Sequence, residues 1–193
     1  MRLHPALFAI LTLLGATSTR ASAQSRPTPK AHTHGLATLD IAIEGRTGVL
    51  RFSAPAEDIY GFERAPRTPA ERQQREAALA RLRTRFAELV IFEASLGCRI
   101  TSTSLTDAVD RAADHDRAQA AGRDHDHEHD NESGHAEVTA DYALACTRPP
   151  AGRDIRFGIT RAFPAVRTVQ VQLLSDDRQE GRRIERDRGT VRP

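Results

Sequence analysis

Hydrophobic and polar residues alternate with a period of two along several short segments of this chain, which predicts β-strands with one buried face. Leu39, Ile41 and Ile43 alternate in this way, and residues 49–53 resume the pattern after a glycine-containing turn at 45–48, as in a β-hairpin. Further strands are predicted at residues 97–105, 138–146, 155–159 and 169–173, followed by a polar turn at 175–181 and a weak last segment at Ile184 and Val191.

One principal helix is predicted after Thr68. Thr68 suits the N-cap, Pro69 suits the first helical position, and Glu71 completes a capping box. Apolar residues then recur at helical spacing, namely Leu79, Leu82, Phe86 and Leu89. The mixed segment 54–63 predicts a short helical turn. Together these elements predict an α+β fold, in which a mainly antiparallel sheet of about six or seven strands packs against this helix.

The first 23 residues have the features of a secretory signal peptide. An apolar run at 6–14 is too short to cross a bilayer comfortably, and small residues at 21–23 precede Gln24 as in a cleavage site. The rival interpretation is a retained anchor. We expect residues 24–193 to form a single exported domain, with no stable membrane insertion because no other segment is apolar for long enough.

The charge pattern argues against a nucleic-acid partner. Cleavage after residue 23 would remove Arg2 and Arg20 and no acidic residue, so the formal net charge would fall from +2 to 0. The remaining arginines alternate with acidic residues, as at 178–180 and 183–188, and aromatic residues make up only 5% of the chain. Neither a basic patch nor a set of stacking side chains is therefore indicated.

Residues 107–134 form a long segment rich in Asp and His, with almost no large apolar residue. Such a composition predicts a disordered, solvated loop, because too little apolar surface is available to offset the entropy of ordering it. Histidines concentrate here: five of the eight lie within 21 consecutive positions, namely His115, His125, His127, His129 and His135.

Neutral imidazole is a common protein ligand for Zn²⁺, Cu²⁺ and Ni²⁺. In an extended chain His125, His127 and His129 would project to one side, whereas in a helix His125 and His129 would pair at the i, i+4 spacing. With His135 they are the candidate metal ligands of this loop, and His115 is interpreted as a bystander. A solubilising insertion with incidental metal affinity is the alternative.

A second group of histidines precedes the first predicted strand. His32 and His34 share a face if that strand begins there, and His135 opens the strand after the loop. If the sheet brings these two strand entrances together, His32, His34 and His135 could form a better-ordered site. The alternative is that His32 and His34 are ordinary polar residues near the N-terminus.

The chain has two cysteines, Cys98 and Cys146, on either side of the histidine-rich segment. In an exported protein they are expected to form one disulfide, which would tie together the two ends of the loop. Paired thiolate metal ligands are the rival interpretation. Signatures of catalysis are missing, including a helical His-Glu-x-x-His and a Gly-x-Ser-x-Gly motif. We therefore expect a binding protein rather than an enzyme.

Several segments of the chain form a recognisable pattern. They are His32-Thr33-His34-Gly35 with the alternation up to Gly45, Ser53-Ala54-Pro55-Ala56-Glu57-Asp58-Ile59-Tyr60-Gly61-Phe62-Glu63-Arg64-Ala65-Pro66, Cys98, the histidine loop, Ala140-Asp141-Tyr142-Ala143-Leu144-Ala145-Cys146, and Phe163-Pro164 through Leu173. They cover about residues 32–174, and the second is the most specific. In these segments the chain resembles the ZrgA-type zinc-uptake accessory proteins, a periplasmic family of Gram-negative bacteria. Members often carry histidine after Gly-Phe-Glu, where this chain has Arg64, so no ligand carries over to that position.

The resemblance implies a periplasmic protein that binds Zn²⁺ in support of a zinc ABC importer. We expect His125, His127 and His129 to collect the ion, helped by His135 and by His32 and His34, and to pass it to the transporter or its solute-binding protein. Two alternatives remain open at this point. One is a buffer for Ni²⁺, Co²⁺ or Cu²⁺ linked to metal tolerance, and the other is a structural module with an inert loop.

Overall fold

The computed structural model describes residues 33–109 and 136–193. The predicted signal peptide at 1–23 lies outside these ranges, as do His32, His115, His125, His127, His129 and His135. The predictions for those residues therefore stay predictions. The start of the predicted loop is revised, because Asp107 closes a strand and Val109 is buried in the core.

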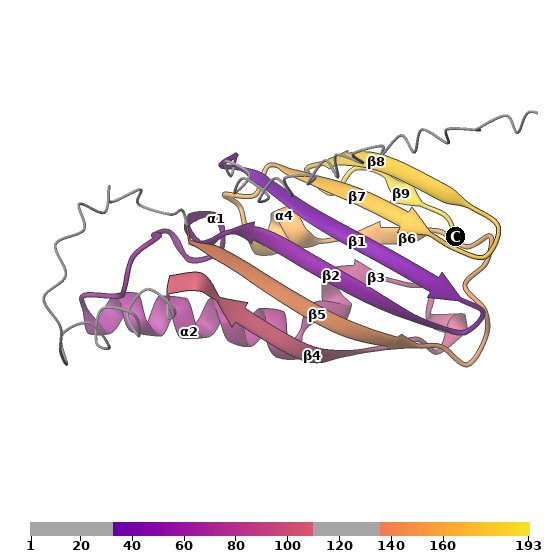
Figure 1. The fold of residues 1–193 in the computed structure, drawn as a ribbon, viewed down its shortest axis with the longest axis horizontal. Coiled ribbons are helices and arrows are strands. Elements are labelled where there is room, and N and C mark those ends of the chain that lie inside the picture. Colours follow the sequence, from indigo (N-terminus) through magenta and orange to yellow (C-terminus); the bar gives the residue numbers. More distant parts are fainter. Residues whose placement is uncertain (1–32, 110–135) are drawn as a thin grey trace, which may run out of the picture. The chain divides into compact units, whose positions relative to one another are not determined.

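A six-stranded sheet with the order β4-β5-β2-β1-β7-β8 forms the centre of the described part (Figure 1). Neighbouring strands are antiparallel except for the parallel pair of β1 and β7. This confirms the predicted fold class. The strands are β1 (Leu36–Glu44), β2 (Thr47–Pro55), β4 (Arg99–Asp107), β5 (Glu137–Ala145), β7 (Thr168–Leu174) and β8 (Gln179–Glu185).

The alternating pattern places one face of each central strand in the core. In β1 the side chains of Leu39, Ile41 and Ile43 are buried, while Asp40 and Glu44 are exposed. Successive side chains of a strand point to opposite faces, so the period of two in the sequence becomes one buried and one solvent-facing surface. The predicted hairpin is thereby confirmed as β1 and β2.

The principal helix α2 (Pro69–Thr84) begins as predicted. The hydroxyl of Thr68 accepts a hydrogen bond from the backbone N–H of Glu71, and the Glu71 carboxylate accepts one from the N–H of Thr68, which is a complete capping box. The short helix α1 (Ala56–Tyr60) occupies the segment for which a helical turn was predicted. Two single 3₁₀ turns, Phe86–Glu88 and Ala94–Leu96, connect α2 to the strands that follow.

A second, three-stranded sheet lies on the same side of the large sheet as α2 (Figure 1). It consists of β3 (Val90–Ile91), β6 (Ile155–Phe157) and β9 (Thr190–Val191). Three predictions are wrong in detail. Ile159 begins helix α4 (Ile159–Ala162) instead of continuing the strand, and residues 179–181 belong to β8 instead of a turn. Ile184 and Val191, grouped in one weak segment, lie on different strands.

The core lies between the large sheet and the layer formed by α2 and the small sheet. Phe86 stacks on Tyr142 of β5 at a centroid distance of 3.7 Å, and it meets Phe52 of β2 edge-on at 5.9 Å. The hydroxyl of the buried Tyr142 donates to the carbonyl oxygen of Leu82 in α2 at 3.0 Å. Apolar burial and this bond together hold the helix against the sheet.

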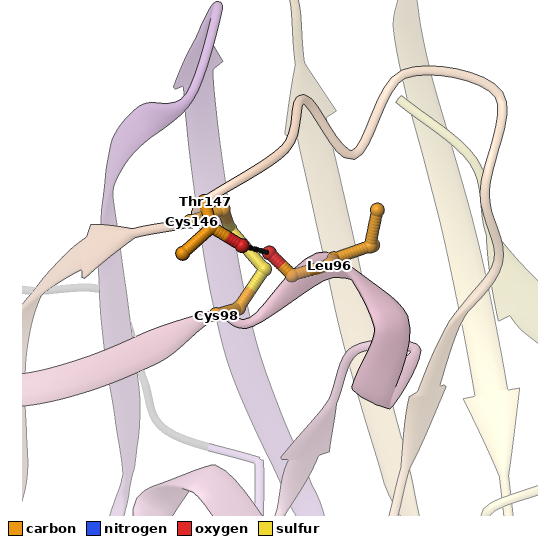
Figure 2. Close-up of a disulfide and its surroundings, with 4 residues drawn as sticks. All are labelled: Leu96, Cys98, Cys146 and Thr147. Carbon is orange, nitrogen blue, oxygen red and sulfur yellow. Dashed lines mark hydrogen bonds between the residues drawn. A yellow bond between two sulfur atoms is a disulfide. The ribbon is translucent and has the colours of Figure 1, made fainter.

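Cys98 and Cys146 form the predicted disulfide (Figure 2). Next to it, the hydroxyl of Thr147 donates to the carbonyl oxygen of Leu96 at 2.8 Å. The bridge lies just outside the first pair of the β4–β5 ladder, Arg99 with Ala145, whereas the histidine-rich segment leaves from the other end of these strands. The expectation that the bridge ties the ends of the loop together is therefore wrong.

Candidate metal centre

The candidate centre lies at the end of the large sheet where β1 and β5 begin and β2 ends. The final residue of β2, Pro55, leads directly into α1, whose backbone reverses at Gly61 with a φ of 91°. This positive φ is easily adopted only by glycine. The sharp turn brings the acidic residues of α1 and of the segment that follows it close to the turn that precedes β1.

His34, Glu57 and Glu63 converge at this end, each offering one ligand atom, with these atoms all within 4.8 Å of one another. Nδ1 of His34 lies 3.6 Å from a carboxylate oxygen of Glu57, and these two side chains are 46% and 55% exposed. Oε1 of Glu63 is buried. The cluster therefore combines two accessible donors on the solvent side with a carboxylate that reaches into the protein.

These separations suit a small divalent cation. Bonds from Zn²⁺ to imidazole nitrogen and carboxylate oxygen are about 2.0–2.2 Å long, so tetrahedral ligands lie about 3.4 Å apart. The three side chains need only a small adjustment to reach that spacing. Two carboxylates and one neutral imidazole would balance the charge of the ion, and solvent access would leave a further coordination position for water or another ligand.

The turn that carries His34 is held in place by Asp58, the residue after Glu57. The buried Asp58 carboxylate accepts a hydrogen bond from the backbone N–H of Gly35 at 2.6 Å. Burial raises the pKa of Asp58, and the hydrogen bond from Gly35 opposes that rise. On the other side, the carbonyl oxygen of Gly35 accepts from the N–H groups of Arg167 and Thr168, both at 2.9 Å.

Arg64 is not directed to the cluster. Its guanidinium donates two hydrogen bonds to the Glu71 carboxylate, at 2.7 and 3.1 Å, and lies 5.3 Å from the ring centre of Phe62. Together with the N–H of Arg67, the Arg64 guanidinium lowers the pKa of Glu71 to about 2. At the position after Gly61-Phe62-Glu63, this chain therefore has a residue that supports the start of α2.

The two ends of the histidine-rich segment are also attached to α1. The buried carboxylate of Asp107, at the end of β4, accepts hydrogen bonds from the Tyr60 hydroxyl at 3.0 Å and from Nε of Arg75 at 2.7 Å. At the other end, the carbonyl oxygen of Ala136 accepts from the N–H of Ala56 at 2.8 Å. Burial and the charge of Asp107 raise the pKa of Tyr60, whose hydroxyl therefore stays protonated.

Of the predicted histidine ligands, only His34 lies within the described ranges. The strands that follow His34 and His135 do begin at the same end of the sheet, but β2 runs between them, so β1 and β5 are not neighbours. The sequence reasoning missed Glu57 and Glu63. Both are in the segment 54–63, whose resemblance to the family was the one available signal, but nothing in their spacing indicated a partner near residue 34.

Together, the fold and the cluster define the class of protein: an α+β domain with a histidine–carboxylate group suited to a divalent cation. Within the described residues, no helix combines the length and apolar character needed to cross a bilayer. The family model of the ZrgA family zinc uptake protein matches residues 31–193, so the chain belongs to this family. No curated relative matches it at a significant level. The family supports a role in zinc uptake.

Proposed function

We propose that this protein is a periplasmic zinc-binding protein that captures Zn²⁺ and delivers it to a zinc ABC importer or to the importer's solute-binding protein. The observation that carries the proposal is the convergence of His34, Glu57 and Glu63, with ligand atoms within 4.8 Å of one another, in a member of a zinc uptake family. It acts as a binding protein and not as an enzyme, and Zn²⁺ is its cargo.

The exposure of His34 and Glu57 supports transfer rather than storage. A structural zinc site is closed by four protein ligands, which holds the ion tightly. Here there are three donors, and two of them, His34 and Glu57, are exposed. A coordination position would therefore stay open, so an incoming ligand can bind the ion before the protein releases it. Exchange through such a mixed-ligand state is what a delivery protein requires.

The histidine-rich segment supplies the capture step in this proposal. His125, His127, His129 and His135 offer several interchangeable imidazoles, and His32 precedes His34 by two residues. Both ends of the segment, at Val109 and Ala136, are attached near α1, the helix that carries Glu57. Ions collected by these histidines would therefore be released close to the ordered cluster.

The disulfide supports the proposed compartment. Cys98 and Cys146 are bonded to each other, and such bonds persist in oxidising compartments such as the periplasm. The bond also removes both thiols as metal ligands, which leaves histidine and carboxylate as the donors. This donor set suits Zn²⁺, while Ni²⁺, Co²⁺ and Cu²⁺ bind the same groups and must be separated by experiment.

The test is growth and intracellular zinc of a strain that lacks the gene, measured in zinc-limited medium. We expect the wild-type gene to restore both. A version with His34 and Glu57 changed to alanine, and one with His125, His127 and His129 changed to alanine, should each restore them only in part. Glu88→Ala, which removes an exposed carboxylate that is paired with Arg85, is the matched control and should restore growth fully.

Two results would contradict the proposal. Full restoration by both histidine-deficient versions would show that zinc binding by these residues is not needed for uptake. A deletion strain that grows normally without zinc but fails in excess nickel, cobalt or copper would favour a role in metal tolerance instead.

A further inference from the structure

The described part of the protein has two buried acidic residues, Asp58 and Asp107, which are 6% and 7% exposed. Both are bound to the region of α1. Asp58 belongs to the helix and holds the turn at Gly35, and Asp107 accepts from Tyr60, the last residue of the helix. Burying a carboxylate disfavours folding unless hydrogen bonds compensate for the lost hydration, so the burial of Asp58 and of Asp107 needs an explanation.

Asp107 has enough partners to account for its burial. It accepts hydrogen bonds from Tyr60, Arg75 and the N–H of Val109, and the guanidinium of Arg75 supplies the opposite charge. Asp58 differs, because its one hydrogen bond among those identified comes from a neutral backbone group, the N–H of Gly35. His34 and Arg167 act on the Asp58 carboxylate through their charge. Fold stability alone is a weak reason to keep a charged group there.

The geometry around Gly35 indicates what Asp58 does. Gly35 has a φ of 81°, and a β-carbon there would lie 2.6 Å from Nε of Arg167. Arg167 also donates to the carbonyl oxygen of His34 at 3.4 Å. The turn is therefore held from two sides, by the Asp58 carboxylate and by Arg167, and its conformation sets where the imidazole of the preceding residue, His34, points.

We propose that Asp58 is a positioning residue of the zinc site: through the N–H of Gly35 it fixes the turn that holds His34 against Glu57 and Glu63. This inference rests on the proposed function, because it concerns the same site. Asp58 itself does not ligand the ion. Glu57 and Asp58 are consecutive in α1, so one short helix supplies both a ligand and the group that aligns a second ligand from a distant part of the chain.

The test measures zinc affinity by titration calorimetry at pH 7.5, with Zn²⁺ as the probe, in a mature chain whose five histidines from 115 to 135 are changed to glutamine. This parent retains His34, Glu57 and Glu63. Asp58→Ala removes the acceptor for Gly35, whereas Asp58→Asn keeps a carbonyl oxygen of similar size at that place. Asp107→Asn is the matched control, since it alters the other buried acid, which lies at the end of β4 and is hydrogen-bonded to Tyr60 of α1. Urea unfolding of each variant reports its stability.

We expect Asp58→Ala to weaken zinc binding about tenfold or more, as seen for residues that orient metal ligands, and Asp58→Asn to recover part of the loss. Asp107→Asn should lower stability without changing zinc affinity. In a His34→Ala background, Asp58→Ala should have almost no further effect on any residual zinc binding, because it acts through His34. If Asp58→Ala does not fold, Asp58→Asn in the same two backgrounds decides the question.

Four results would overturn the inference. Unchanged zinc affinity in Asp58→Ala would show that the turn does not depend on this carboxylate. Equal weakening by Asp58→Ala and Asp107→Asn would assign the effect to fold stability. If the parent chain binds zinc and its His34→Ala variant binds zinc equally well, the site lies elsewhere. If the parent chain does not bind zinc at all, the His34–Glu57–Glu63 site of the proposed function fails as well.

Discussion

Removal of the disulfide should lower stability strongly and leave zinc binding intact. The bridge between Cys98 and Cys146 spans 48 positions of sequence, and in the loop-entropy model closing such a loop stabilises the folded state by about 4 kcal/mol. The double variant Cys98→Ala/Cys146→Ala should therefore lose up to ~4 kcal/mol of unfolding free energy. Residual pairing of β4 with β5 in the unfolded chain would make the loss smaller.

The position of the bridge explains why zinc affinity should not change. Eight residue steps along β4, from the Arg99–Ala145 pair to the Asp107–Val138 pair, separate the bridge from the end of the hairpin that is attached to α1. At about 3.3 Å per residue this is roughly 26 Å.

Urea unfolding followed by far-ultraviolet circular dichroism suits this chain, which has no tryptophan, and calorimetry gives the zinc affinity. A loss of stability below about 1 kcal/mol would contradict the entropic argument. A loss of zinc affinity in a variant that is still folded would contradict the separation of the bridge from the metal site.

Three further outcomes are expected. The hydrogen bonds from Arg64 lower the pKa of Glu71 from 4.5 to about 2, so this carboxylate stabilises the fold above pH 4.5 and loses that effect as the pH falls towards 2. Glu71→Gln should therefore flatten the acid-unfolding curve between these two pH values, and an unchanged slope would refute this prediction. Tyr142→Phe leaves the buried carbonyl of Leu82 without its donor and should lower the unfolding free energy by about 1–2 kcal/mol in urea, whereas no change would mean that another donor replaces it. Zinc affinity should fall as the pH drops through about 6.5, because imidazole binds metals in its neutral form, and equal affinities at pH 7.5 and 5.5 in calorimetry would exclude imidazole ligands.

Local signals in the sequence were enough to predict most of the fold. The alternation around Leu39 and Ile41 places β1 and its buried face, and the residues Thr68 and Glu71 mark the start of α2 through a capping box formed within four positions. Both signals depend on contacts between neighbours in the chain, which a single sequence displays directly. Ile159 was misassigned because an isolated apolar residue after a short strand fits a continued strand as well as a new helical turn.

The candidate metal centre could be predicted only in part. His34 was recognised from its type and its place before β1, but Glu57 and Glu63 belong to a segment more than 20 residues later in the chain. Their approach to His34 depends on the positive φ of Gly35 and Gly61 and on the hydrogen bond from Gly35 to α1. These are tertiary features, and no periodic pattern in the sequence encodes them.

The same reason explains the error about the disulfide. Cys98 and Cys146 flank the histidine-rich segment in the sequence, which suggested that they also flank it in space. Two nine-residue strands lie between the bridge and that segment, so the bond closes the opposite end of the hairpin. The attachment of the segment depends on Asp107 and Ala136 instead.

Anomalous diffraction at the zinc absorption edge, from crystals of the mature protein grown with Zn²⁺, tests the central claim most directly. We expect a zinc peak within about 2.0–2.2 Å of a ring nitrogen of His34 and of carboxylate oxygens of Glu57 and Glu63. Zinc bound elsewhere in the crystal, with these three side chains free of metal, would contradict the account.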